Sequence, residues 1–408
     1  MKLNQNAKNA VNIALLCSLS YLAVYCAKDT LGAVTPQIIA SGAASQSEIG
    51  TYSSTYFICY AVGQLINGIV GDKIKARYMM CSGMVFSAIS IFVFSNCMGL
   101  GWAARIAYGV TGFFLSMIFG PLTKLVAENT DPIYTPRCNL AYTFAAYLGA
   151  PLAGLAASLL AWKTVYNTAV AFLLVMGIVC YIIFLAFEKQ GIIRYGRFDQ
   201  TKQTAAKASA KEKIRTLLQH RIAKFALAAM ITGVVRTAVV FWMPTYISQA
   251  LGFSPDRAAS IFAAASCVLC SNTFVAVLAY ERLKRNMDLT MRLAFGGATV
   301  MFLLVYAVKQ PTFNVIFLVL GVLFSNSAAS IIWAKYCPSL RNTGLVSSAS
   351  GFLNFCSYMA ASAASKIFAD AVAQIGWGNL ILVWAGLMVL GLSLMLTGSK
   401  KIPGESAA

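Results

Sequence analysis

Residues 188–221 read EKQGIIRYGRFDQTKQTAAKASAKEKIRTLLQHR and form the longest polar stretch of this chain. The stretch is basic, and apolar residues dominate the sequence on both sides of it. The 408-residue chain is 59% hydrophobic and only 11% charged, whereas soluble domains are about 25% charged. This composition is typical of a helical membrane protein, and the polar stretch divides it into two halves.

Apolar segments of about 20 residues recur in both halves, and each is long enough to cross a hydrocarbon core of about 30 Å. They predict an all-α membrane protein with about twelve spans, of which the first and eleventh are long enough to tilt or bend. No small-residue cleavage site follows the first apolar run, so we expect no removable signal peptide. The spans are expected near residues 10–40, 50–71, 78–96, 102–127, 138–160, 165–187, 222–248, 258–280, 291–308, 313–336, 343–369 and 379–397.

With about twelve spans and one long polar stretch, the chain is predicted to have three parts. We predict an N-terminal six-helix bundle over residues 1–187, a cytoplasmic basic linker over 188–221, and a C-terminal six-helix bundle over 222–408. The two bundles are expected to be pseudo-symmetric, and the chain is expected to act as a monomer.

The formal net charge of +19 is distributed unevenly over the connecting segments. Lysine and arginine gather in one alternating set of connections, which includes the linker and both termini. The opposite set has few, chiefly Lys163, Arg257 and Lys309. By the positive-inside rule, both termini should lie in the cytoplasm, in a multi-pass protein of the cell (inner) membrane. The lipid bilayer explains the charge better than nucleic acid does, so no nucleic-acid partner is expected.

The residues that usually carry enzyme chemistry do not form recognisable patterns in this sequence. The eleven cysteines lie nearly all within spans and form neither a disulfide framework nor a zinc motif. Cys267 and Cys270 are one helical turn apart and are interpreted as packing residues, and His220, the single histidine, belongs to the basic linker. No paired serine nucleophile and no phosphate-binding loop is present. We therefore expect no enzyme activity, no cofactor and no metal site.

A repeat is visible in the rare charges within or near the spans. At three positions, a residue of the first half has a counterpart of similar type 208 residues later in the second half. Further along the chain this spacing increases to 209 and then 211, as small insertions in the loops would cause. The paired residues are Lys28 with Arg236, Pro36 with Pro244 and Glu48 with Asp256 at 208, Asp72 with Glu281 at 209, and Lys124 with Lys335 at 211. The two halves are therefore predicted to be parallel repeats related by an axis along the membrane normal.

Arg236 and Lys28 are the residues that most need a functional explanation. Arg236 lies about 20 Å along its span, at a rise of about 1.5 Å per residue, and Lys28 reaches a similar depth. A cation at mid-membrane costs about 3 to 17 kcal/mol, so it must face water, a counter-charge or a ligand. An ion pair with Asp29, the only deep acid, would neutralise one cation and not two. We favour an anion-binding role for both.

Lys124 and Lys335 lie near the cytoplasmic ends of their spans. Either they line a cytoplasmic cavity mouth and attract anions, or their long side chains reach the lipid headgroups. The sequence leaves both alternatives open.

Two motifs resemble a known superfamily. The segment GIVGDKIKAR, Gly68 to Arg77, is similar to the loop signature of the major facilitator superfamily, with Gly68, Asp72, Lys73 and Arg77 at the matching positions. A degenerate second copy, YERLKR, follows at residues 280–285. The resemblance implies two six-helix bundles around a central cavity and a gating role for the loop motif at the cytoplasmic ends of the bundles.

Three further stretches resemble the organophosphate:phosphate antiporter family, which includes glycerol-3-phosphate and hexose-6-phosphate transporters. Arg236, Trp242, Pro244, Thr245 and Tyr246 match its pattern in the seventh span; Tyr25 and Lys28 match part of its first-span pattern, and residues 343–377 resemble its eleventh span. The chain departs from the family at Lys28 and Asp29, where arginine and lysine are usual, and in lacking a histidine within residues 141–154.

The resemblance implies a secondary active transporter of small anionic solutes that works by alternating access, with organophosphate/phosphate exchange as the favoured activity. Arg236 and Lys28 would face each other in the cavity and bind the substrate, Tyr25 would donate a hydrogen bond to it or serve packing, and Trp242 and Tyr246 are expected to be interfacial anchors. The alternatives are a proton- or sodium-driven symporter of carboxylates or sulfonates, with Asp29 as coupling group, and a transporter-like sugar-phosphate sensor.

Overall fold

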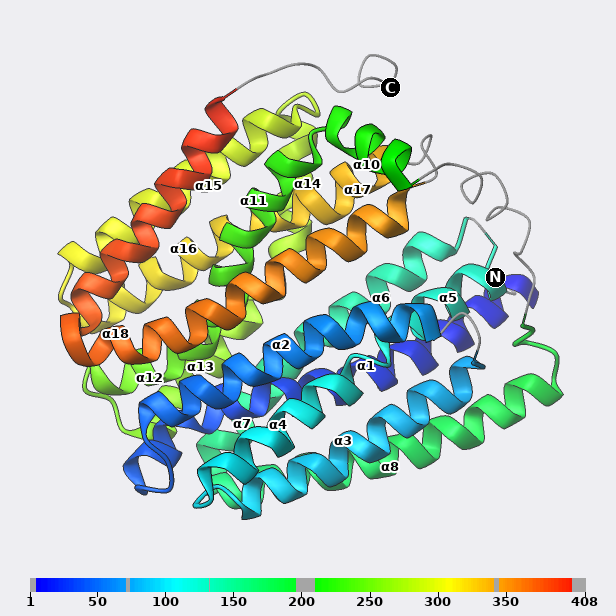
Figure 1. Cartoon of the computed structure of the whole chain (residues 1–408), viewed down its shortest axis with the longest axis horizontal. Helices are drawn as coiled ribbons and strands as arrows, with labels where there is room; N and C mark the ends of the chain where they lie inside the picture. Colours follow the sequence, from blue (N-terminus) through cyan, green and yellow to red (C-terminus); the bar gives the residue numbers. More distant parts are fainter. Residues whose placement is uncertain (1–4, 71–73, 132, 196–209, 341–344, 398–408) are drawn as a thin grey trace. The chain divides into compact units, whose positions relative to one another are not determined.

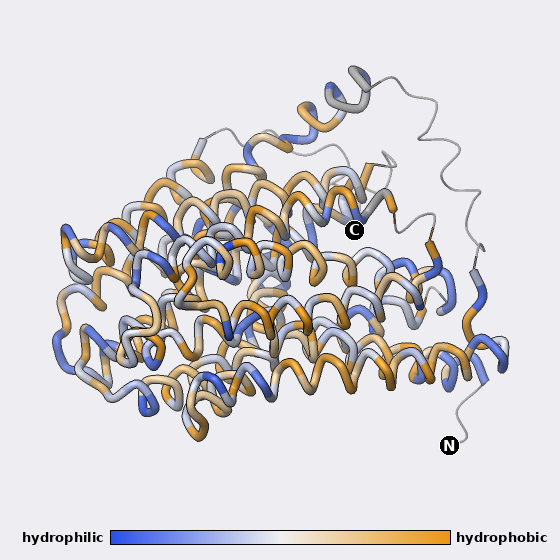
Figure 2. The backbone as a smooth tube through the Cα atoms, turned by 60° about the horizontal axis from the view of Figure 1, so that its bottom comes forward, coloured by the Kyte–Doolittle hydropathy of each residue, from blue (hydrophilic) through white to orange (hydrophobic). Residues whose placement is uncertain are grey.

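A computed structural model describes residues 5–70, 74–131, 133–195, 210–340 and 345–397, and these residues form helices and short connections only (Figure 1). Figure 2 shows that apolar residues dominate the helices and that hydrophilic residues gather near their ends. Ten helical stretches among these residues are long and apolar enough to span a membrane. The last of them, Ser348–Leu396, is divided at Gly376, whose φ of 73° is incompatible with a continuous helix.

Helix α2 is a further helix of spanning length, with 25 residues. When α2 is included and the two parts of the divided stretch are counted separately, the number of spans agrees with the prediction of about twelve. The all-α membrane fold predicted from the sequence is confirmed.

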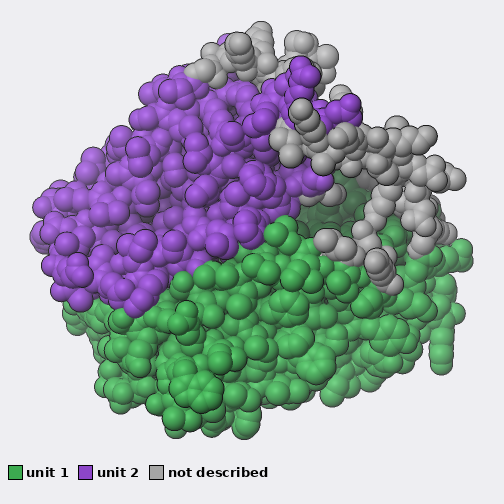
Figure 3. Space-filling view, viewed as in Figure 1, with its two compact units in different colours: residues 1–199, 243–270 green, residues 200–242, 271–408 purple. Residues whose placement is uncertain are grey.

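Residues cluster by contact into two compact units, coloured separately in Figure 3. Unit 1 comprises residues 1–199 and 243–270, and unit 2 comprises 200–242 and 271–408. These units do not follow the halves of the sequence, because a helix of the second half, α13, packs along α7 within unit 1. The predicted division into two bundles joined by the basic linker stays a prediction.

Unit 1 is built from nine helices among the described residues. Two predicted spans of unit 1 are each made of two consecutive helices, with breaks at Ser116–Ile118 and at Leu148. Buried aromatic side chains fill the interior; the rings of Phe94 and Tyr108 stack at 4.4 Å. The helices are α1 (Gln5–Ala40), α2 (Gln46–Val70), α3 (Ala76–Asn96), α4 (Gly101–Leu115), α5 (Phe119–Asn129), α6 (Thr135–Tyr147), α7 (Gly149–Leu159), α8 (Trp162–Lys189) and α13 (Pro255–Leu269).

Unit 2 contains two π-helical turns in addition to its α-helices. Its core includes the stacked rings of Phe225 and Tyr336, 3.7 Å apart. Helix α12 (Val240–Gln249) crosses the boundary between the units. The elements of unit 2 are α10 (Ala210–Gln219), α11 (Ile222–Gly233), η1 (Val234–Val239), α14 (Asn272–Arg282), α15 (Met287–Ala307), α16 (Pro311–Ile331), η2 (Ile332–Tyr336), α17 (Cys337–Ser339) and α18 (Val346–Leu396).

Local sequence signals set several helix starts. The side chains of Ser254, Asn286 and Gln310 accept hydrogen bonds from backbone N–H groups three residues ahead, and so cap α13, α15 and α16. Ser45 and Glu48 form a reciprocal capping box at the start of α2: the carboxylate accepts from the Ser45 backbone N–H at 2.8 Å, and Ser45 Oγ accepts from the Glu48 N–H at 3.3 Å. These caps place polar groups at the ends of otherwise apolar spans.

Candidate functional site

Lys28 lies on α1 against two aromatic rings of unit 1. Its Nζ is 4.5 Å from the centroid of the Tyr25 ring, one turn earlier on α1, and 5.5 Å from the Tyr60 ring on α2. Both distances are within the range of a cation–π contact, in which the negative face of the ring attracts the ammonium. Tyr60 is 1% exposed, whereas Tyr25 and Lys28 are half-buried. The ammonium is therefore held at the surface of an aromatic core.

The close packing of α7 against α1 fixes the position of Tyr25. A Cβ atom added at Gly149 would lie 2.6 Å from both the backbone carbonyl carbon and the Cβ of Tyr25, closer than such atoms can approach. The ring of Tyr25 also meets Tyr21 edge to face at 4.9 Å. Glycine is thus required at the start of α7, and Tyr25 has little freedom to move away from Lys28.

Asp29 follows Lys28 on α1 but points about 100° away around the helix. Among the residues that the structure describes, Asp29 forms no ion pair with Lys28. The alternative in which Asp29 neutralises one of the two deep cations by a direct ion pair is therefore not realised at Lys28. Asp29 remains a half-buried acid inside a span.

Arg236 belongs to unit 2 and lies in the middle of the apolar stretch Ile222–Gln249, on the π-helical turn η1. A π-helical turn inside an α-helix is rare and is frequently found at functional sites. Nη2 of Arg236 is 3.5 Å from Ser357 Oγ of α18, and its guanidinium carbon is 5.6 Å from the centroid of the Tyr358 ring. Lys335 lies on the other π-helical turn, η2, with Nζ 4.9 Å from the Tyr280 ring. Both predicted cations of unit 2 thus lie on irregular helical turns beside a tyrosine.

The helical segments on both sides of η1 lie close to α18. A Cβ at Gly233, the last residue of α11, would lie 2.7 Å from the Ser357 carbonyl oxygen, so α11 and α18 meet at this glycine. Trp242 Nε1 donates to the Ser365 carbonyl at 3.2 Å, and the Trp242 side chain is fully buried. Tyr246 is also buried, at 3% exposed. The expectation that Trp242 and Tyr246 are interfacial anchors is wrong, because their side chains pack inside the protein.

The remaining predicted residues belong to unit 1. Lys124 Nζ is 4.0 Å from Glu128 Oε1, one turn along α5. Arg77 Nη1 donates to Glu188 Oε2 at 2.7 Å and so joins the start of α3 to the end of α8, and Tyr195 donates to the other oxygen of Glu188 at 2.7 Å. In the loop motif, Gly68 lies within α2, whereas Asp72 and Lys73 lie outside the described residues. The proposed roles of these residues in gating and at the cavity mouth stay predictions.

Three residues that contact the two deep cations were not predicted from the sequence: Tyr60, Ser357 and Tyr358. For Tyr60 a signal was present, since Tyr52, Tyr56 and Tyr60 recur every four residues and must share one face of a helix. For Ser357 and Tyr358 no local signal exists, because their relation to Arg236 depends on how α18 packs on η1.

Among the described residues, no group of three or more histidine, cysteine, aspartate or glutamate side chains has the geometry of a metal site.

Comparisons with known proteins identify the family of this chain. Residues 17–365 match the family description Major Facilitator Superfamily. The membrane sensor protein UhpC of Escherichia coli (strain K12) is 24% identical over 412 residues, covering 94% of this chain and 90% of the relative. The glycerol-3-phosphate transporter of Bacillus subtilis (strain 168) is 24% identical over 231 residues, covering 52% of each chain.

A solved structure of a D-xylose-proton symporter has a similar fold, with a TM-score of 0.73 and 13% identity over 97% of this chain and 99% of the other. At this identity, the likeness concerns the fold alone. The relatives named above confirm the resemblance to organophosphate transporters that the sequence motifs indicated.

Proposed function

Since the chain belongs to the major facilitator superfamily, a family of non-enzymatic membrane transporters, we propose that its cargo is a small organophosphate exchanged for phosphate by alternating access. The observation that carries the proposal is the pair of deep cations, Lys28 and Arg236. Each is held beside tyrosine in its own unit, and Arg236 lies on a π-helical turn. A dianionic phosphate offers the charge that two such cations need, and guanidinium binds it through two parallel N–H groups.

The repeat predicted from the sequence supports an anion-binding role for both cations. Lys28 and Arg236 occupy equivalent positions at an offset of 208, and in transporters built from repeats the substrate binds where the repeats meet, near the bilayer midplane. Bound phosphate would screen the repulsion between the two cations in a medium of low dielectric constant. An occupied carrier would then reorient more easily than an empty one, which is the requirement for exchange.

Two other functions have a specific observation in their favour. Asp29 is a half-buried acid next to Lys28 and is the natural coupling group if transport of a carboxylate or sulfonate is driven by protons or sodium. A relative that matches over 94% of the chain is a membrane sensor protein, which favours the alternative of a receptor that binds its ligand without moving it. Both alternatives keep an anionic ligand at the same cations.

Transport assays in proteoliposomes distinguish these functions. For an exchanger, vesicles loaded with phosphate take up labelled phosphate or glycerol phosphate, empty vesicles do not, and a proton gradient adds little. Uptake into empty vesicles that follows a proton or sodium gradient would establish the symporter. A protein that binds ligand in a thermal-shift assay but moves nothing in either experiment would be a sensor.

Arg236 is tested directly in the same assay. Arg236→Ala is expected to abolish transport, and Arg236→Lys to weaken binding sharply, because an ammonium keeps the charge but loses the planar pair of donors. Expression and thermal stability without ligand serve as the control for folding. Normal transport by either variant would remove the main support for the phosphate site.

We further propose that the protein lies in the inner membrane with both termini in the cytoplasm, as the distribution of lysine and arginine predicts. Reporter proteins fused after Lys213 or Lys401 should be cytoplasmic, and reporters inserted near Ser45 or Gln310 should be external. A reporter after Lys213 that proves external would reverse the orientation of the whole chain.

A further inference from the structure

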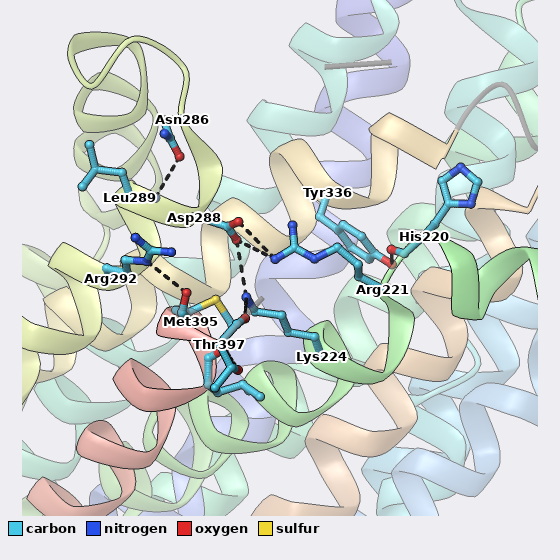
Figure 4. Close-up of polar contacts among 11 residues, drawn as sticks. His220, Arg221, Lys224, Asn286, Asp288, Leu289, Arg292, Tyr336, Met395 and Thr397 are labelled. Carbon is cyan, nitrogen blue, oxygen red and sulfur yellow. Dashed lines mark hydrogen bonds and ion pairs between the residues drawn. The ribbon is translucent and has the colours of Figure 1, made fainter. Parts of the chain in front are cut away.

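Three basic side chains and one carboxylate meet at one end of unit 2, where α11 and α15 begin and α18 ends (Figure 4). Arg221 Nη2 donates to both oxygens of Asp288 at 3.0 Å, and Lys224 Nζ is 3.8 Å from Asp288 Oδ1. Lys224 Nζ also donates to the Thr397 carbonyl at 3.0 Å. Arg292, one turn after Asp288, donates from Nε to the Met395 carbonyl at 2.9 Å. We call Arg221, Lys224, Asp288 and Arg292 the basic cluster.

The basic cluster has an excess of positive charge that its own members do not neutralise. Asp288 offsets one of the three cations, and the carbonyl end of α18 supplies about half a negative charge. The cluster is also partly removed from water, since the side chains of Arg221, Lys224 and Asp288 are 14%, 11% and 17% exposed. Excess charge in such a place favours binding of an external anion.

Arg292 supplies donors for that anion. Within the described part of the chain, Nε is the only nitrogen of this guanidinium with a hydrogen-bond partner. Nη1 and Nη2 are therefore left for an acceptor, and a guanidinium binds the oxygens of phosphate through two parallel N–H groups.

An exposed apolar surface borders the basic cluster. Leu289 and Leu293 of α15 are 37% and 53% exposed, and Leu396 at the end of α18 is 59% exposed. Leu293 follows Arg292 in sequence and Leu396 follows Met395, so the hydrogen bond between Arg292 and Met395 brings both leucines to the same edge. A group of cations beside exposed leucines matches a molecule with an anionic head and an apolar tail.

We propose that Lys224 and Arg292 bind the phosphate of an anionic phospholipid, whose acyl chain lies along Leu289, Leu293 and Leu396. Basic pockets between spans at the cytoplasmic side are suited to acidic headgroups, and the basic cluster lies at the helix ends that adjoin the basic linker. The site is separate from the proposed transport site, because Arg236 is twelve residues beyond Lys224, or about 18 Å along the helix. The lipid site does not depend on which solute the protein transports.

The test uses the intact purified protein and three probes: phosphatidylglycerol, phosphatidylcholine with the same acyl chains, and inorganic phosphate. Native mass spectrometry counts bound lipid, and thermal shift follows stabilisation against lipid concentration. We expect phosphatidylglycerol to bind at least about fivefold more tightly than phosphatidylcholine, and high salt to reduce this preference.

Variants locate the bound lipid. Arg292→Gln is expected to weaken phosphatidylglycerol binding about fivefold. Arg282→Gln removes the same charge from an exposed residue at the end of α14, outside the basic cluster, and should change binding less than about twofold. If Arg292→Gln does not fold, Arg292→Lys, which keeps a charge and a donor, should give a smaller loss of about twofold to threefold.

Three results would each overturn the proposal. Equal binding of the two lipids would show that headgroup charge is not recognised. An equal loss in the Arg282→Gln and Arg292→Gln variants would show a general effect of net charge. Complete displacement of phosphatidylglycerol by inorganic phosphate at a similar concentration would show a soluble-anion site in which the acyl chain has no part.

Discussion

The contact between Lys28 and the tyrosine rings can be tested by changing Tyr25 in two ways. Tyr25→Phe keeps the ring face beneath the ammonium and removes only the hydroxyl group. Tyr25→Leu removes the ring as well. The pair of variants separates a cation–π role of Tyr25 from a hydrogen bond between its hydroxyl and the substrate.

The distances set the expected size of the effect. The ammonium is 4.5 Å from the Tyr25 ring and 5.5 Å from the Tyr60 ring, so Tyr25 makes the stronger of the two contacts. A cation–π contact contributes about 0.5–1 kcal/mol when exposed and about 2 kcal/mol when desolvated. Because Tyr25 and Lys28 are both half-buried, we expect a loss of about 1–2 kcal/mol in binding free energy for Tyr25→Leu. This corresponds to about a fivefold to thirtyfold weaker affinity for the anionic substrate.

The assay is the affinity of purified protein for glycerol phosphate, measured by thermal shift and by counterflow into phosphate-loaded vesicles. Tyr25→Phe should bind nearly as well as the natural protein if the ring is what matters, and as poorly as Tyr25→Leu if the hydroxyl contacts the substrate. Tyr52→Leu is the matched control, since Tyr52 lies on the same helix face as Tyr60 but two turns, or about 12 Å, away. Unchanged affinity in a stably folded Tyr25→Leu protein would refute the role of the ring.

Three further changes test the packing, a helix cap and the deep acid. Gly149→Ala should lower the free energy of unfolding by about 1–3 kcal/mol, because the added methyl group meets the backbone of Tyr25 at 2.6 Å; Gly386→Ala, with no atom within 4 Å, should not lower the melting temperature. Glu48→Gln should cost about 1 kcal/mol at pH 7 through the loss of the charged capping box. Hydrogen bonds from the Ser45 N–H and hydroxyl hold the pKa of Glu48 below its usual value. The Glu48 carboxylate therefore stabilises the folded protein fully above the ordinary glutamate pKa, and this contribution is lost as the pH falls through the lowered pKa of the folded state. Melting temperatures of the natural and Glu48→Gln proteins should then converge once the pH falls below the lowered pKa of Glu48, and a gap that persists in strong acid would contradict the charged cap. Asp29→Asn should leave phosphate counterflow intact in an exchanger, whereas loss of gradient-driven uptake would identify Asp29 as a coupling group.

Lys28 and Arg236 illustrate how far local sequence could go in predicting a candidate site. Both were found because a cation in the middle of an apolar span is costly wherever the span packs, so the sequence alone marks the residue as exceptional. Their partners were not found in the same way. Tyr60, Ser357 and Tyr358 are ordinary residues of apolar helices. Only the tertiary structure brings the Tyr60 ring of α2 near Lys28, and packs α18 on η1 so that Ser357 and Tyr358 lie beside Arg236.

The number and nature of the spans were determined by the sequence itself, because the thickness of the bilayer and the need to pair every backbone N–H and C=O group leave few structures for an apolar chain. The family motif and the predicted repeat likewise rest on local properties, namely residue types at fixed spacings. The π-helical turns at Arg236 and Lys335, the burial of Trp242 and the basic cluster around Asp288 were decided only by the tertiary structure. These features depend on close approach between helices far apart in the chain, and no periodicity along a single helix encodes which neighbour it will meet.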